Sequence, residues 1–185
     1  MNNLNLVLPE IFISISIMFL LVLGVFKKDS SKLIFNISLI VLFITLIITF
    51  NETFAINRKT LFNDSVVIDY MSSLMKIITL IATFLVLVIS SSYLKTTKIF
   101  KIEYPILILS SVLGMLIMIS SNDLIVFYMG LELQSLALYV LATFNRDKLK
   151  SSEAGLKYFV LSALSSGLLL YGCSLVYGFS GSTNF

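Results

Sequence analysis

Glu132 has the setting in this chain that most favours chemistry, because its carboxyl group interrupts a long apolar segment at 124–144. It lies about eight residues into that segment, or about 12 Å from its start at a helical rise of ~1.5 Å per residue. Tyr128, Ser135 and Tyr139 stand at i−4, i+3 and i+7, so one face of the predicted helix is a polar stripe centred on the carboxyl group. Such a carboxyl group stays protonated when it is isolated, and a nearby ammonium group favours its ionised form. Switching between these states by a movable neighbour is what proton translocation requires.

Lys157 is the second candidate for proton transfer. It lies about one turn into the apolar segment 154–179, and its vertical separation from Glu132 is of order 12 Å at a rise of ~1.5 Å per residue. That separation is too long for a direct ion pair and suits a chain of water molecules or an intervening charge. Each residue also has a structural interpretation that stays open. A lysine near a helix end can extend its ammonium group to the membrane interface, and Glu132 can hydrogen-bond another helix only to fix packing.

Asp69 and Lys76 form a possible secondary polar pair in a third apolar segment, 66–94. They are seven residues apart, so on one helix they would share a face two turns apart. Placing an ionisable group at membrane depth costs roughly a few kcal/mol of free energy or more, so such a group usually faces a protein interior or water. Pairing with other helices for assembly is the favoured interpretation here, and a functional role is the alternative.

Six apolar segments must position these residues. Hydrophobic residues make up 58% of the chain and charged residues 12%, against roughly 45–50% and about 25% in soluble domains. About 20 mainly apolar residues span a bilayer as a helix, which satisfies its own backbone hydrogen bonds in lipid. The sequence therefore predicts an all-α, polytopic transmembrane bundle in the lipid bilayer, forming a single domain over 1–185. Its predicted helices cover about 4–26, 33–50, 66–94, 104–121, 124–144 and 154–179.

The basic residues between these segments predict the orientation in the membrane. Arg58 and Lys59 are the basic residues on one side, and nine lie in the first, third and fifth connections: Lys27, Lys28, Lys32, Lys95, Lys98, Lys101, Arg146, Lys148 and Lys150. Loops rich in lysine and arginine stay on the cytoplasmic side. Both termini are therefore expected outside.

The sequence lacks the residues that several kinds of chemistry need. Histidine is absent and Cys173 is the one cysteine, so we expect no metal site and no disulfide framework. No phosphate-binding loop, dinucleotide fingerprint or nucleophile with its base is present. We therefore expect no cofactor and no redox site in this chain, and no nucleic-acid partner.

The segment 120–185 resembles the antiporter-like subunit N of NADH–quinone oxidoreductase, the respiratory complex I. The runs GLELQSLALYVL, SSEAGLKYF and YGFSGSTNF carry this resemblance, and residues 66–119 resemble the family more loosely. The resemblance implies a proton-pumping membrane subunit with inverted helix repeats and broken helices. In that family a fifth-helix glutamate falls on Glu132 and a sixth-helix lysine on Lys157. Glu132 would hold a proton at mid-membrane. Lys157 would relay that proton toward the cytoplasmic side or change the pKa of Glu132 through its charge.

The resemblance also implies the setting of the chain. It would be one subunit of a translocase enzyme, beside the other membrane subunits of complex I. NADH, flavin, iron–sulfur clusters and quinone would be bound by other subunits. The composition, rich in Ile, Asn, Lys and Ser, fits an AT-rich genome. A bacterial inner membrane is favoured over the mitochondrial inner membrane.

Members of that family continue beyond the point where this sequence stops, into a broken seventh helix with a central lysine. The chain is therefore expected to be truncated relative to the family. Three interpretations follow: a fragment, one half of a split subunit completed by a second polypeptide, or the remnant of a decaying gene. Pumping by this chain alone is not expected.

Two other functions stay open. The large subunits of multisubunit monovalent cation/proton antiporters look similar, although the GLELQSLALYVL and SSEAGLKYF runs favour subunit N. The third hypothesis is a non-transporting structural fragment, whose helices only occupy a place in an assembly.

Overall fold

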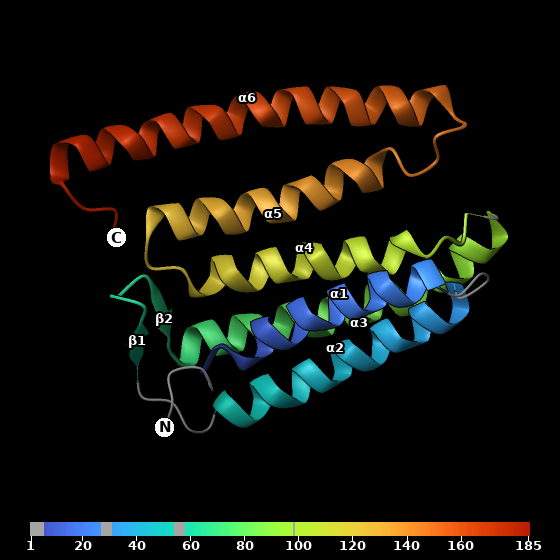
Figure 1. Ribbon diagram of the computed structural model, residues 1–185, viewed down its shortest axis with the longest axis horizontal. Helices are drawn as coiled ribbons and strands as arrows, with labels where there is room; N and C mark the ends of the chain where they lie inside the picture. Colours follow the sequence, from blue (N-terminus) through green and yellow to red (C-terminus); the bar gives the residue numbers. More distant parts are fainter. Residues whose placement is uncertain (1–5, 27–30, 54–57, 98) are drawn as a thin grey trace.

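Six helices and one short hairpin make up the part of the chain that the structure describes, residues 6–26, 31–53, 58–97 and 99–185 of a computed structural model. Each helix is long and apolar enough to cross a membrane, and Figure 1 shows them running alongside one another. The predicted fold class, a polytopic bundle of six transmembrane helices, is confirmed. The helices are α1 (Leu8–Phe26), α2 (Ser31–Thr53), α3 (Tyr70–Thr96), α4 (Glu103–Ser120), α5 (Leu124–Ala142) and α6 (Leu149–Ser180).

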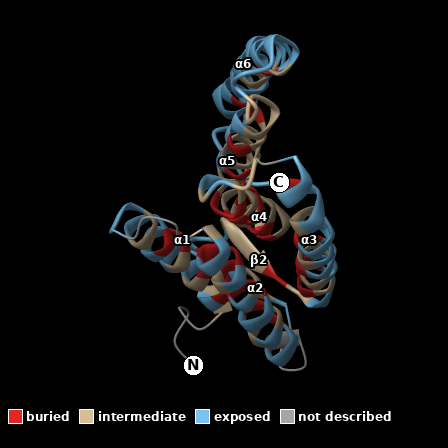
Figure 2. Ribbon diagram, turned by 90° about the vertical axis from the view of Figure 1, so that its right-hand side faces the viewer, coloured by how far each residue is buried: buried red, intermediate tan, exposed pale blue. Residues whose placement is uncertain are grey.

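The first four helices enclose the hydrophobic core. Aliphatic side chains from all four form one buried cluster, which includes Ile13, Leu20, Ile34, Leu42, Leu80, Leu87, Leu109 and Leu116. Helix α5 packs on α4, and α6 packs on α5 (Figure 2). The buried residues of α6 are Gly155 and Cys173, so most of its surface is exposed. The chain thus consists of a buried four-helix cluster with two further helices stacked outward from α4.

The third helix begins four residues later than the sequence predicts. Residues Val66–Ile68 form strand β2, which pairs antiparallel with β1 (Lys59–Leu61). Asp69 then caps α3: its carboxylate accepts a hydrogen bond from the backbone N–H of Ser72, whose hydroxyl accepts one from the N–H of Asp69. The prediction of a helix from residue 66 is wrong because a short β-branched run suits a strand, and hydropathy cannot distinguish the two.

The sixth helix is longer than the sequence predicts. It begins at Leu149 rather than at residue 154, and it ends at Ser180. Its first turns carry polar and charged residues, which a hydropathy criterion excludes although they are helical. The hydroxyl of Ser151 donates a hydrogen bond to the carbonyl of Ala142, the last residue of α5. This bond joins the start of α6 to the end of α5.

The turn between α4 and α5 joins three segments that are distant in the sequence. The side chain of Asn122 donates a hydrogen bond to the carbonyl of Asp64 in the hairpin, and its backbone N–H donates one to Ser65. Asp123, the N-cap of α5, accepts a hydrogen bond from the hydroxyl of Thr183, beyond the end of α6. We call these contacts the end junction; it lies at the hairpin end of the bundle (Figure 1).

Asp123 is a buried carboxylate with several donors. Burial alone would raise its pKa, but hydrogen bonds from Thr183 and from the backbone N–H groups of Ile125 and Val126 outweigh that effect. The pKa of Asp123 is therefore lowered from its ordinary value. A carboxylate at the N-terminus of a helix is also favoured by the helix dipole.

Two glycines let α4 and α5 approach until their backbones touch. A Cβ atom on Gly114 would lie 2.6 Å from the backbone nitrogen of Gln134 and 2.7 Å from the carbonyl oxygen of Gly130. A Cβ atom on Gly130 would lie 2.9 Å from the carbonyl oxygen of Gly114. Small residues commonly permit such contacts between membrane helices. This contact fixes α5, and with it Glu132, against the four-helix cluster.

Gly114→Ala should therefore destabilise the chain. A glycine-to-alanine change inside a helix normally stabilises it by up to ~1 kcal/mol, but here overpacking against backbone atoms should cost roughly 1–3 kcal/mol. The free energy of unfolding in detergent micelles measures this. Gly167→Ala is the matched control, because nothing lies within 4 Å of a Cβ atom there. Equal stability of the two variants would contradict the close contact.

Asp123→Ala should lower the free energy of unfolding by about 1 kcal/mol, the usual cost of losing an N-cap. Because the folded pKa is lowered, the ionised carboxylate adds stability above its unfolded pKa of about 3.9, and this stability is lost as the pH falls through the folded pKa. Asp123→Asn should keep most of the capping and lose this acid dependence. Unfolding measured from neutral to acidic pH tests both variants. An unchanged acid dependence in Asp123→Asn would show that the carboxylate contributes nothing.

Candidate functional site

Glu132 lies near the middle of α5, eight residues after Leu124, and its side chain is half-buried. One carboxyl oxygen, Oε2, is buried and accepts no hydrogen bond from any residue that the structure describes. Buried polar atoms without partners are rare in native proteins, and each calls for an explanation. An oxygen in this state can accept a proton or a hydrogen bond from water.

The polar stripe around Glu132 divides into different roles. The hydroxyl of Ser135 donates a hydrogen bond of 3.0 Å to the backbone carbonyl of Glu132 and so serves its own helix. Tyr128 is half-buried, whereas Tyr139 is buried. The ring of Tyr139 meets the rings of Tyr158 and Phe159 in α6 edge to face, with centroid distances of 4.9 Å and 5.7 Å. Tyr139 therefore fastens α6 to α5.

Lys157 lies two turns into α6, with its side chain 67% exposed. Its ammonium nitrogen is 2.6 Å from Oε1 of Glu153, one turn earlier on the same helix. Such exposed pairs contribute roughly 0–1 kcal/mol to stability, so this one is easily broken. Among the described residues, the ion-pair partner of Lys157 is Glu153 rather than Glu132.

Asp69 and Lys76 have different roles in the structure. Asp69 precedes α3 and caps it, so it lies at the start of the helix rather than inside it. Lys76 instead points into the bundle and is 3% exposed. Its ammonium nitrogen lies 2.5 Å from Oε1 of Glu10, in the first turn of α1. The expectation of pairing with another helix thus holds for Lys76 alone.

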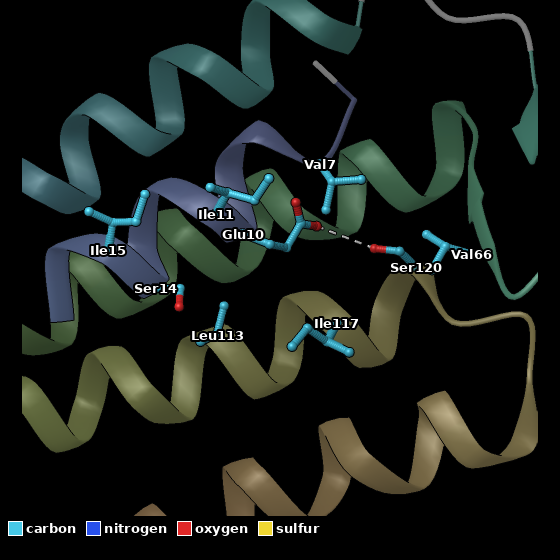
Figure 3. Close-up of a pocket in the computed structure, with 9 residues that line it drawn as sticks. All are labelled: Val7, Glu10, Ile11, Ser14, Ile15, Val66, Leu113, Ile117 and Ser120. Atoms are coloured by element: carbon cyan, nitrogen blue, oxygen red, sulfur yellow. Dashed lines mark hydrogen bonds between the residues drawn. The ribbon is translucent and has the colours of Figure 1, made fainter. Parts of the chain in front are cut away.

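Glu10 is the ionisable residue that the sequence interpretation missed. Its signal was the same as that of Glu132, a carboxyl group inside a predicted apolar helix, but it lies near the start of a segment without distinctive motifs. Glu10 is 7% exposed, and its Oε2 atom accepts no hydrogen bond from any described residue. Ser120, the last residue of α4, places its hydroxyl 3.5 Å from Oε1 of Glu10, as Figure 3 shows.

Carboxyl and ammonium groups thus define the chemistry of these sites. The described residues include no group of three or more Cys, Asp or Glu placed to hold a metal ion. Glu10 and Glu132 each have a buried oxygen available to a proton or to water. Lys76 is already paired inside the bundle, whereas Lys157 is paired at its surface. The arrangement suits the holding and transfer of protons.

The chain is similar to known membrane proteins. The family model described as NADH:quinone oxidoreductase/Mrp antiporter, TM, matches residues 121–185. The NADH-quinone oxidoreductase subunit N of Pelagibacter ubique is 70% identical over 185 residues, which are 100% of this chain. The chain is similar to subunit N over its whole length. It spans 39% of the length of that subunit N, which fits an N-terminal portion.

Solved structures share the fold of this chain. A chain of respiratory complex I from Thermus thermophilus has a TM-score of 0.80 and 25% identity, and the match covers 95% of this chain and 38% of that one. A chain of the Mrp complex from a Dietzia species has a TM-score of 0.78 and 21% identity, covering 99% of this chain and 36% of that one. The antiporter-like fold is therefore common to both kinds of complex.

Tyr139→Ala should loosen α6 from α5. Removing a buried aromatic ring that packs against two others should lower the free energy of unfolding by about 3 kcal/mol. Tyr139→Phe keeps the ring and should leave stability within ~1 kcal/mol of the parent chain. Unfolding in detergent micelles measures both, with Tyr171→Ala as the control because Tyr171 is 64% exposed. Equal losses in the phenylalanine and alanine variants would show that the hydroxyl, rather than the ring, matters.

Proposed function

We propose that this chain provides the N-terminal helices of a membrane subunit of proton-pumping NADH–quinone oxidoreductase, where they form part of the proton path. The observation that carries this proposal is the 70% identity to subunit N over the full chain. The buried and unpartnered carboxyl oxygen of Glu132 supplies a chemical basis for it. In this proposal NADH, flavin, iron–sulfur clusters and quinone are bound by other subunits of the same translocase.

Glu132 is the proton-holding group in this proposal. Its carboxyl group has no ion-pair partner among the described residues, and its buried Oε2 atom accepts no hydrogen bond from them, so in this proposal Oε2 is the atom that holds the proton. The approach of an ammonium group favours the carboxylate and releases the proton. Lys157 can take part because its pair with Glu153 is exposed and weak. Freed from Glu153, its positive charge is available to tune Glu132 or to relay a proton by way of water.

The proposed setting is a bacterial inner membrane, next to the other membrane subunits of the complex. The relative from Pelagibacter ubique is bacterial, and the six apolar helices suit a multi-pass protein. Both termini are proposed to lie outside. The α3–α4 and α5–α6 connections, which contain Lys101, Arg146 and Lys148, lie at the end of the bundle opposite the hairpin (Figure 1). A cytoplasmic location of that end follows the positive-inside rule.

A subunit of a monovalent cation/proton antiporter is the second candidate. It is favoured by the shared fold with the Mrp complex and by the description of the family model. The two candidates differ in the ion that must be present. Proton transport that depends on sodium would favour the antiporter, whereas transport that depends on NADH oxidation favours the oxidoreductase.

Glu132→Gln, introduced into the full-length subunit, should lower NADH-driven proton translocation several-fold, because the amide cannot release a proton. Inverted membrane vesicles with a pH-sensitive dye measure the translocation. NADH oxidation with an artificial acceptor reports how much complex is assembled. Glu103→Gln makes the same chemical change at an exposed position in the first turn of α4, and it should pump normally. Normal pumping by Glu132→Gln would refute the proposed role.

A further inference from the structure

Glu10 and Lys76 form a second buried ionic site, distinct from Glu132 on α5. We propose that they and the cavity beside them form a proton-exchange site, in which water in the cavity brings protons to Glu10 and removes them. This inference rests on the proposed function, because it adds a point of proton entry or exit to the same translocation path. It lies at the hairpin end of the bundle, near the starts of α1 and α3 and the end of α4.

The hydrogen bonding of Glu10 is one-sided. Its Oε1 atom lies 2.5 Å from the ammonium nitrogen of Lys76 and 3.5 Å from the hydroxyl of Ser120. Its Oε2 atom accepts a hydrogen bond from none of the described residues, although the side chain is only 8% exposed. A pair that served only to join helices would gain from satisfying both oxygens. The free oxygen therefore points to a further partner.

The cavity supplies room for that partner. It is a groove of about 310 Å³ that opens to the surface between α1 and α4, where Ile15 is 64% exposed, and its polar lining residues are Glu10, Ser14 and Ser120. Its remaining walls are aliphatic side chains, among them Val7, Ile15 and Ile117 (Figure 3). A water molecule occupies about 30 Å³ and needs roughly two to four polar partners. The cavity has room for water, and the groups that could hold it there are the Glu10 carboxyl group and the side chains of Ser14 and Ser120. Ser14 lies one turn beyond Glu10 along α1, so water bound to both residues would extend into the span.

The charges in this region favour a proton over a metal cation. Glu10 is the titratable residue that lines the cavity from α1, and the described lining residues of α4 and β2 add none. The ammonium group of Lys76, from α3, already neutralises the carboxylate. A sodium ion would meet no net negative charge and would need several oxygen ligands, whereas a proton needs only the single oxygen Oε2. Hydronium transfers its proton as one O–H bond breaks and another forms on Oε2; water, neutral Glu10 and charged Lys76 remain, and the reverse step releases the proton.

Two variants of the full-length subunit in the assembled complex test this site by separate routes. The double variant Glu10→Leu with Lys76→Met removes both charges and keeps an apolar interior. Ile117→Phe leaves the pair intact and fills the cavity. Both should lower proton translocation per NADH oxidised by roughly twofold or more, with unchanged NADH oxidation by an artificial acceptor. Ile89→Phe makes the same change at an exposed position on α3, and it should pump normally.

Infrared spectroscopy distinguishes protonation of Glu10 from a role of the ion pair in packing alone. The complex should show a carboxylic-acid C=O band that titrates with pH and disappears in Glu10→Gln. Absence of such a band, or normal pumping by Ile117→Phe, would overturn the proposal even if the double variant fails to assemble. Glu132→Gln in the same vesicles separates the two proposals. If it is impaired while the Glu10/Lys76 and Ile117 variants pump normally, this inference alone fails; if Glu132→Gln also pumps normally, the proposed function fails too.

Discussion

The ion pair between Lys76 and Glu10 constrains the arrangement of the first four helices. Helices α1 and α3 each pack against α2 and α4, and the pair connects them across the cluster. A buried charge without its partner is strongly unfavourable, at about 3–5 kcal/mol when one member of a pair is removed. The register of α1 along α3 must therefore keep these two side chains within reach of each other. The hydrophobic effect alone would tolerate many such registers, because it is not directional.

The number of helices in this chain could be predicted from the sequence. Which helices and side chains contact one another could not. All six spans follow from hydropathy, because each must satisfy its own backbone in lipid. The hairpin was not predicted, because Val66–Ile68 is so short and apolar that its sequence cannot be distinguished from the start of a helix. The roles of Asp69 and Lys76 could not be predicted for a different reason. Spacing on one helix says which residues share a face, whereas the ion pair of Lys76 with Glu10 depends on how two helices pack.

The candidate residues show the same division. The depth of Glu132 was readable from its place in an apolar run, and the structure adds that one of its oxygens is buried without a partner. The role of Tyr139 was not readable, because its ring contacts residues of α6 that the periodicity of α5 cannot identify. Lys157 was expected to act toward Glu132, yet its nearest carboxylate is one helical turn away on its own helix, in Glu153. Local pairs of this kind follow from i,i+4 spacing and precede any tertiary contact.

The end junction has a consequence for biogenesis. Asn122 and Asp123 bond to the hairpin before them and to Thr183 after them. During synthesis the hairpin and the α4–α5 turn can meet once four helices have inserted, but Thr183 reaches the same membrane face only after α6 has crossed. The carboxylate of Asp123 thus acquires the hydrogen bond from Thr183 only after α6 has inserted. The junction closes in a fixed order, and its completion marks the point at which this set of helices has been fully threaded into the bilayer.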